Sequence, residues 1–262
     1  PRPGPKPRQR PLDILLVEDN PINQRLATSL LEKHGHRVTV AGHGQEAVEL
    51  AESRRFDLIL MDIQMPELSG FQATEQIRAR ERQTGGHVPV VAMTAYAMPG
   101  DRERCLARGM DGYLAKPIRG EELLATLERL AGASLPPADR PPSPPATPVL
   151  DRAALLQNVE NDTGLMHTVV GMFLDSIPRD LAALRAALEG NDPAALHKQA
   201  HTLKGLLGTV GAAAAAGVAQ QLEEAPPAEA GPLLARLEAE VQRLLPELEE
   251  LRETAGPAGT SV

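Results

Sequence analysis

Cysteine and aromatic residues are the scarcest components of this sequence. Its 262 residues include one Cys, no Trp, two Tyr and three Phe. A single cysteine excludes an intrachain disulfide and a zinc site built from several thiolates, so we interpret Cys105 as a packing residue. So few rings argue against a stacking platform for single-stranded nucleic acid. The hydrophobic cores must therefore be built from aliphatic side chains and methionine.

Positive charge is scarce as well. The 27 basic and 35 acidic residues give a net charge of −8, and the only basic stretch is residues 1–11. We therefore expect neither nucleic acid nor a membrane surface to be a direct partner. No apolar run reaches the roughly 18 residues of a membrane helix, and the chain does not begin with a secretory signal.

Proline is abundant and is concentrated in two stretches. Residues 1–11 carry Pro at almost every second position, and residues 131–148 contain seven prolines. We interpret residues 1–11 as a disordered basic linker from an upstream segment and residues 132–148 as a semi-rigid spacer. These stretches predict one domain at 12–131 and another at 149–255, with a flexible tail at 256–262.

The first predicted domain alternates short apolar runs with amphipathic helices. Asn20 and Pro21 are typical of a helix cap and first turn. The pattern implies a doubly wound parallel α/β sheet, in which ligands bind at the carboxyl ends of the strands. The predicted strands are 13–17, 37–41, 58–61, 90–93 and 112–114, and the helices after the first are 45–53, 70–82, 100–108 and 121–130.

The second predicted domain has helical periodicity only. Short turns between its helices indicate an antiparallel bundle, with Asp192 as one helix cap. Pro178 and Pro246 predict helix boundaries or kinks. The predicted helices are 165–174, 178–189, 193–207, 212–224 and 233–252.

Polar residues follow four of the five predicted strands. Glu18 and Asp19 follow the first, Asp62 the third, Thr94 the fourth and Lys116 the fifth. In a parallel sheet these positions meet at one edge, where three carboxylates repel one another unless a cation such as Mg²⁺ lies between them. A hydroxyl and an ammonium group suit the oxygens of a phosphoryl group. The constellation predicts phosphoryl transfer to an aspartate.

Each of these residues has a simpler explanation when taken alone. Acids after a strand often cap a helix, Lys116–Pro117 is typical of a turn, and Thr94 by itself indicates nothing. The joint placement is what favours phosphoryl chemistry. A haloacid-dehalogenase-like phosphatase needs a second Asp two residues after the nucleophile, where this sequence has Gln64.

The segments LLVEDNPINQ, MDIQMPELSGF, VAMTAYA and YLAKP resemble the response-regulator receiver domain, over essentially all of residues 12–131. The resemblance implies a flavodoxin-like sheet of order 2-1-3-4-5 with Asp62 as the phosphoacceptor. It also implies a Mg²⁺ ion bound by Asp19 and Asp62 directly, by Glu18 mainly through water, and by the backbone carbonyl of Gln64.

The same resemblance assigns the residues after the last two strands. Thr94 and Lys116 would hold the phosphoryl oxygens, and Tyr113 would be a switch residue whose rotamer follows phosphorylation through Thr94. The Lys116–Pro117 peptide is expected to be cis.

A second candidate acceptor lies in AHTLKG, residues 200–205. His201 and Lys204 share a helix face, and Gly205 leaves that face open. An imidazole is a good nucleophile toward phosphorus, and a nearby ammonium attracts phosphoryl oxygens. Residues 151–253 resemble a histidine phosphotransfer (HPt) domain, which implies that His201 accepts the phosphoryl group, Lys204 assists it and Gly205 gives a partner room to dock.

Two other interpretations of this helix remain open. His197 and His201 have the spacing of zinc ligands, although Lys198 occupies the position of a metalloprotease Glu base. His197 is also a candidate phosphoacceptor, without the Lys-Gly context.

Together the resemblances imply the carboxy-terminal part of a hybrid sensor histidine kinase, without a kinase core because no Gly-rich nucleotide motif is present. We expect the dimerisation domain of a histidine kinase to donate to Asp62, Asp62 to donate to His201, and His201 to donate to a downstream response regulator. The alternative is a binding switch in which phosphorylated Asp62 changes protein contacts without transfer. The expected location is the cytoplasm, whether or not the parent kinase is anchored in a bacterial membrane. Whether the chain is itself an enzyme stays open.

Overall fold

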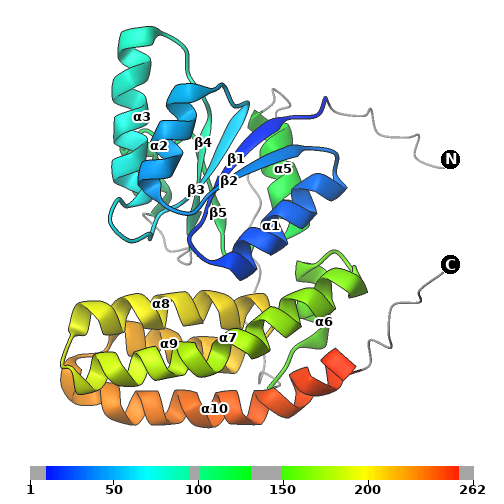
Figure 1. Ribbon diagram of the computed structural model, residues 1–262, viewed down its shortest axis with the longest axis vertical. Helices are drawn as coiled ribbons and strands as arrows, with labels where there is room; N and C mark the ends of the chain where they lie inside the picture. The colour runs from blue at the N-terminus through cyan, green and yellow to red at the C-terminus, as the bar shows by residue number, and fades with distance from the viewer. Residues whose placement is uncertain (1–9, 95–100, 131–148, 254–262) are drawn as a thin grey trace, which may run out of the picture. The chain divides into compact units, whose positions relative to one another are not determined.

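The computed structural model describes residues 10–94, 101–130 and 149–253. These residues form an α/β part (residues 10–130) and a helical part (residues 149–253) (Figure 1). The spacer predicted at 132–148, the tail at 256–262 and most of the first linker lie outside the described residues. None of the helices in these ranges combines the length and the hydropathy that a membrane span requires.

The α/β part is built on a five-stranded parallel sheet in the order β2-β1-β3-β4-β5. This confirms the predicted α/β class and strand order. The strands are β1 (Asp13–Val17), β2 (Arg37–Ala41), β3 (Leu58–Asp62), β4 (Val90–Thr94) and β5 (Gly112–Ala115). The helices are α1 (Pro21–Lys33), α2 (Gly44–Ser53), α3 (Gly70–Thr84), α4 (Asp101–Ala107) and α5 (Gly120–Leu130).

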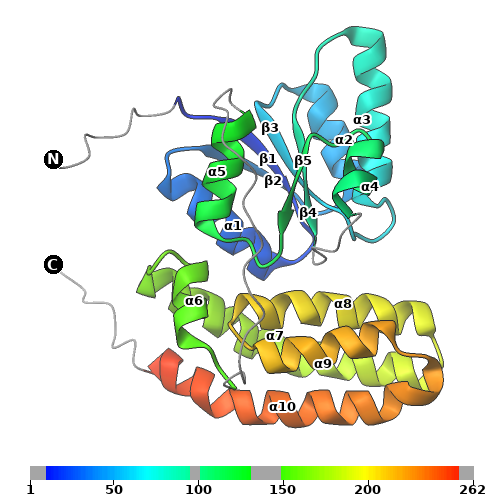
Figure 2. The ribbon, with the colours of Figure 1, turned by 180° about the vertical axis from the view of Figure 1, so that it is seen from behind.

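The central strands are covered on both faces. Helices α2, α3 and α4 lie on one side of the sheet, and α1 and α5 lie on the other (Figures 1 and 2). All five residues of β3 and of β4 are buried. Because side chains alternate along a strand, Ile59 and Met61 pack toward α2 and α3 while their neighbours pack toward the opposite layer. Polar side chains are therefore confined to the strand ends.

Helix α1 begins as its sequence predicts. The Oδ1 atom of Asn20 accepts hydrogen bonds from the backbone N–H groups of Ile22 (2.9 Å) and Asn23 (3.3 Å), and Pro21 occupies the first helical position. These bonds satisfy donors that have no partner within the helix. The cap fixes where the segment after β1 turns into α1, directly after Glu18 and Asp19.

The helical part is a four-helix bundle with one short additional helix. Helix α7 packs against α8, α8 against α9, α9 against α10, and α10 against α7, which confirms the predicted antiparallel bundle. Asp192 caps α8 as predicted, accepting hydrogen bonds from Ala194 and Ala195. The helices are α6 (Arg152–Asn158), α7 (Thr163–Glu189), α8 (Pro193–Thr209), α9 (Ala213–Glu224) and α10 (Pro227–Glu253).

Of the boundaries or kinks predicted at Pro178 and Pro246, the boundaries are wrong. The two predicted helices 165–174 and 178–189 form the single helix α7, and α10 continues through both Pro232 and Pro246. All three prolines lie on the exposed sides of their helices. Water can therefore hydrate the carbonyl group that each proline leaves without a donor, while the buried apolar stripe holds the helix together. Helix α6 is an addition to the predicted set.

Candidate functional site

The acidic residues that follow β1 and β3 converge at the carboxyl edge of the sheet. These strands are neighbours, and Val17 lies opposite Met61. Glu18, Asp19 and Asp62 consequently bring one carboxylate oxygen each within 4.8 Å of one another. Glu18 and Asp62 are only 1% and 3% exposed. Buried carboxylates this close repel one another strongly, so the arrangement favours a bound cation.

The loop after β3 holds Asp62 from two sides. The backbone N–H of Gln64 donates to Asp62 Oδ1 over 3.2 Å, which brings the Gln64 backbone beside the carboxylate. The backbone N–H of Gly70 donates to the carbonyl of Ile63 over 3.0 Å. A Cβ atom on Gly70 would lie 2.0 Å from the backbone carbonyl oxygen of Asp62, so a glycine is required there. The sequence identified Gly70 only as the start of a helix and missed this role.

Thr94 and Lys116 lie at or just beyond the carboxyl ends of β4 and β5, and Tyr113 lies inside β5. Thr94 is 6% exposed and ends β4 one residue after Met93, which pairs with Asp62. Lys116 directly follows β5, the strand next to β4, and the Lys116–Pro117 peptide is cis. Tyr113 lies within β5 and is 37% exposed. The sheet thus brings Thr94 to the edge that carries the acids and places Lys116 after the adjoining strand.

The donor set at this edge fits Mg²⁺ better than a softer metal. All three side chains offer carboxylate oxygens, the ligands that Mg²⁺ prefers, and none offers the nitrogen or sulfur typical of zinc sites. Within the ranges that the structure describes, no other set of three His, Cys, Asp or Glu residues is close enough to share a metal ion.

A second polar cluster lies between α8 and α9 of the helical part. His201 and Lys204 on α8 both face Glu223 on α9. His201 Nδ1 lies 2.8 Å from Glu223 Oε1, and Lys204 Nζ lies 2.6 Å from Glu223 Oε2. The side chain of Glu223 is 0% exposed, against 12% for His201 and 8% for Lys204. One buried carboxylate therefore divides its two oxygens between the imidazole and the ammonium.

This contact decides which nitrogen of His201 can act as a nucleophile. An ionised carboxylate can only accept a hydrogen bond. Nδ1 is therefore the protonated ring nitrogen, and its N–H group donates a hydrogen bond to Glu223. In the neutral ring, Nε2 then keeps its lone pair. A substituted Cβ on Gly205 would meet nothing within 4 Å, so the face beside His201 is open there.

The sequence reasoning missed Glu223, although a signal for it exists. Ala219 and Leu222 belong to the buried apolar face of α9, and Glu223 lies on the same face, four residues after Ala219. An acid in the buried stripe of a helix needs a partner with a positive charge or a hydrogen-bond donor. His197 also contacts this residue, through Nδ1 and the backbone carbonyl of Glu223 at 3.0 Å.

Comparison with known families accounts for both parts of the chain. The response regulator receiver domain matches residues 14–128, and the Hpt domain matches residues 168–251. The polar-differentiation response regulator DivK of Brucella anthropi is 39% identical over 122 residues, which cover 47% of this chain and 98% of DivK. The chain belongs to the response regulator receiver family. Its receiver domain is followed by an Hpt domain.

Two longer relatives are sensor kinases. The signal transduction histidine-protein kinase BarA of Escherichia coli is 34% identical over 252 residues, which cover 93% of this chain and 27% of BarA. The sensor histidine kinase GacS of Pseudomonas protegens is 35% identical over 199 residues, covering 73% of this chain and 22% of GacS. The receiver–Hpt chain thus spans about a quarter of the length of these kinases.

A receiver domain and an Hpt domain on one chain make a phosphorelay module. This confirms the class of function predicted from the two sequence motifs. The alternative of a binding switch without transfer is not favoured, because it gives the Hpt domain no role in transfer.

Proposed function

We propose that this chain relays a phosphoryl group from a histidine kinase to a downstream response regulator, first through Asp62 and then through His201. The observation that carries the proposal is the pairing of two matched acceptors on one chain. Asp62 lies in a cluster of three carboxylates, and His201 has its Nδ1 atom turned to a buried carboxylate.

In the first step, a carboxylate oxygen of Asp62 attacks the phosphorus of a phosphohistidine on the dimerisation domain of the kinase. A P–O bond forms and the P–N bond breaks, and the released histidine nitrogen keeps the electron pair of that bond. The Thr94 hydroxyl donates to one phosphoryl oxygen and the Lys116 ammonium pairs with another.

Mg²⁺ would be held by Asp19, Asp62, the backbone carbonyl of Gln64 and, through water, Glu18. When bound, it supplies positive charge that offsets the acids and polarises the phosphoryl oxygens. The hydrogen bond from the Gln64 backbone to Asp62 supports this ligand set, because it brings that backbone to the carboxylate.

In the second step, Nε2 of His201 attacks the phosphorus of phospho-Asp62. A P–N bond forms and the P–O bond breaks, so Asp62 leaves as a carboxylate. The ring gains positive charge, which the hydrogen bond from Nδ1 to Glu223 stabilises. Lys204 pairs with the other oxygen of Glu223 over 2.6 Å. A carboxylate of the downstream regulator then takes the group from His201 in the same way.

The kinase and the regulator are proposed by class only. Similarity to BarA and GacS supports a sensor histidine kinase as the source of the phosphoryl group. We place the relay in the cytoplasm, where such a kinase domain and a response regulator can both reach the chain.

Labelling of the full chain tests the relay. The chain is incubated with acetyl [³²P]phosphate and Mg²⁺, and the label is divided into base-labile phosphoaspartate and acid-labile, base-stable phosphohistidine. We expect both forms in the parent chain, only phosphoaspartate in His201→Gln, and neither in Asp62→Asn or after chelation of Mg²⁺. His197→Gln is the matched control, because His197 lies one turn earlier on α8 and contacts the same residue, and it should keep both forms.

Three results would contradict the proposal. Base-stable label that persists in His201→Gln but disappears in His197→Gln would move the acceptor to His197. Undiminished label in Asp62→Asn would exclude Asp62 as the entry point. Phosphoaspartate with no phosphohistidine in the parent chain would support the binding switch instead.

A further inference from the structure

A cleft of about 400 Å³ lies between α2 and α3, at the end of the sheet opposite the carboxylate cluster. It is lined by the end of α2 and the residues that follow it, by the last turns of α3, and by the segment 85–88 that leads into β4. Its volume falls in the range of sites for small molecules, about 300–1,000 Å³. None of its lining residues belongs to the two acceptor sites.

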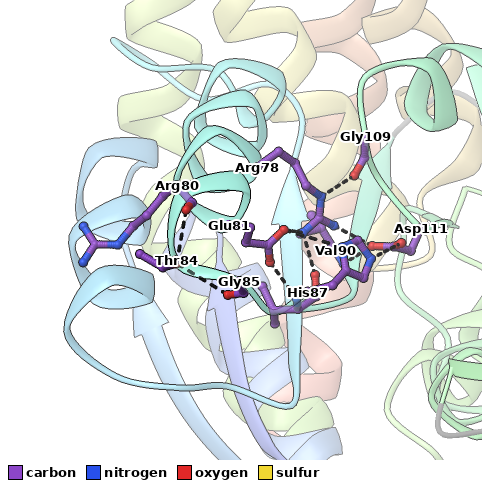
Figure 3. Close-up of polar contacts among 10 residues, drawn as sticks. Arg78, Arg80, Glu81, Thr84, Gly85, His87, Val90, Gly109 and Asp111 are labelled. Atoms are coloured by element: carbon purple, nitrogen blue, oxygen red, sulfur yellow. Dashed lines mark hydrogen bonds and ion pairs between the residues drawn. The ribbon is translucent and has the colours of Figure 1, made fainter.

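One wall of the cleft is held rigid by a network of ion pairs and hydrogen bonds (Figure 3). Arg78, whose side chain is 11% exposed, binds Glu81 and Asp111 with its two terminal nitrogens, each over 2.6 Å. Glu81 also accepts the backbone N–H of Val88 over 2.6 Å, and Asp111 accepts that of Val90 over 2.8 Å. These bonds fasten the segment between α3 and β4 to the residue before β5, so this side of the cleft is preformed.

The floor of the cleft is apolar and its rim carries arginines. The partly exposed side chains of Ala51, Phe56 and Val88 form the floor, and the buried Ile59 and Ile77 lie beneath them. Arg54 places its guanidinium 4.7 Å from the centre of the Phe56 ring, and Arg55 follows it on the rim. Within the described ranges, Arg55 forms no salt bridge, and Arg54 acts on the Asp13 carboxylate only at longer range, where it adds to the larger effect of the Arg37 hydrogen bond in lowering the pKa of Asp13.

A third arginine bridges the cleft. Arg80 on α3 lies 2.7 Å from Glu52 on α2, and both side chains are nearly half exposed, at 45% and 43%. An exposed ion pair of this kind contributes about 0–1 kcal/mol. Arg80 can therefore exchange Glu52 for another anion at small cost.

The arginines are not needed to satisfy the helix ends. The cleft receives the carboxyl-terminal ends of α2 and α3, whose last carbonyls favour positive charge. Three of those carbonyls have donors other than a guanidinium group: the backbone N–H of Arg54 donates to Leu50 O over 3.1 Å, and that of Gly85 donates to Glu81 O over 2.8 Å. The Thr84 hydroxyl donates to Arg80 O over 3.1 Å (Figure 3). These bonds leave the guanidinium groups of Arg54 and Arg55 unused.

We propose that this cleft binds a small organic dianion, with its ring or alkyl part over the apolar floor and its phosphonate, phosphate or carboxylate groups on the arginine rim. The guanidinium fork matches such anions with two parallel hydrogen bonds. The apolar floor adds affinity that an inorganic ion cannot gain.

Phenylphosphonate is a suitable probe, because it combines a ring with a dianion and has no phosphoryl group to transfer to Asp62. It is titrated into the ¹⁵N-labelled full chain in the presence of EDTA, which leaves the carboxylate cluster without a divalent cation. We expect saturable shifts of the amide signals of Phe56, Gly85 and Gly86. Methylphosphonate, which lacks the ring, and benzyl alcohol, which lacks the charge, should each bind at least fivefold more weakly.

Charge-matched variants separate the cleft from general attraction of anions. Arg54→Gln combined with Arg55→Gln should weaken phenylphosphonate binding at least tenfold. Arg25→Gln combined with Arg82→Gln, which removes the same two charges from exposed positions outside the cleft, should change it less than twofold. The amide spectra themselves show whether each variant is folded.

The proposal fails if phenylphosphonate gives no saturable shifts at the cleft, or if the Arg25 and Arg82 double variant weakens binding as much as the Arg54 and Arg55 double variant does. Equal binding of methylphosphonate would also overturn it, since the apolar floor would then have no part in recognition. These outcomes leave the relay untouched, because none of the variants lies in the acceptor sites.

Discussion

Replacing Glu223 by Gln removes one charge from the Hpt site with almost no change of shape. The carboxylate faces two donors, His201 at 2.8 Å and Lys204 at 2.6 Å, and its side chain is fully buried. A glutamine has one oxygen to accept a hydrogen bond and one NH₂ group that only donates. One of the two donors in a Glu223→Gln variant would therefore face another donor.

The structure sets the size of the expected effect. Removing one partner of a buried ion pair costs about 3–5 kcal/mol, and we expect the lower end because Lys204, at 8% exposure, can reach water by extending. Lys204→Met should be similarly costly, because it leaves Glu223 with His201 alone. In the double variant neither charge is left unpaired, so its cost should fall short of the sum of the single costs by about 2 kcal/mol.

Two measurements on the full chain test this reasoning. Hydrogen exchange of α8 and α9, followed by mass spectrometry, gives the local free energy of opening in each variant, which avoids a two-state treatment of a two-domain chain. The rate at which His201 takes label from Asp62 should fall at least tenfold in Glu223→Gln. The double variant should regain stability but not this rate, because Nδ1 still lacks its carboxylate. Additive stabilities within 0.5 kcal/mol, or an unchanged transfer rate, would refute the assigned role of Glu223.

Two further predictions concern the receiver domain. In Gly70→Ala the new Cβ would lie 2.0 Å from the Asp62 carbonyl oxygen, so we expect acetyl phosphate labelling of Asp62 to drop at least tenfold. The control is Gly171→Ala, where nothing lies within 4 Å of the new Cβ, and its Asp62 should be labelled normally. Burial, assisted by neighbouring His34, lowers the pKa of His36 below its ordinary 6.5, and the neutral ring accepts the backbone N–H of Leu12 over 3.3 Å. As the pH falls below about 6.5, His36 is protonated in the unfolded chain before it is protonated in the folded chain. The free energy of unfolding should therefore fall with pH until the lowered pKa of His36 in the folded chain is reached. Hydrogen exchange of the receiver domain, corrected for the intrinsic exchange rate at each pH, should show this slope in the parent chain and a flatter one in His36→Gln; identical slopes would exclude His36 as the source.

The receiver fold could be predicted because its pattern is local. Strands buried on both faces appear as short apolar runs, and polar side chains can follow them only at their ends. The position of Asp62 beside Glu18 and Asp19 then follows from the order of neighbouring strands. The caps at Asn20 and Asp192 were predicted for the same reason, since a cap depends on residues within one turn.

What could not be predicted depends on contacts between distant segments. Glu223 faces His201 only because α8 and α9 pack in one particular register, and residue spacing within a helix does not fix that register. The requirement for Gly70 follows from the approach of a loop to the backbone of Asp62. The continuity of α7 through Pro178 reflects packing of the opposite helix face, which outweighs the local preference of proline.

The exposed prolines of the bundle also matter when it is not yet folded. Pro178, Pro232 and Pro246 lie within the two longest helices of the Hpt domain, α7 and α10, where the structure tolerates them on the solvent side. In a nascent chain the same residues cannot donate to a β-ladder, so these segments are poor templates for intermolecular strand pairing. A feature that is nearly neutral in the native bundle would thus protect the newly made chain from aggregation.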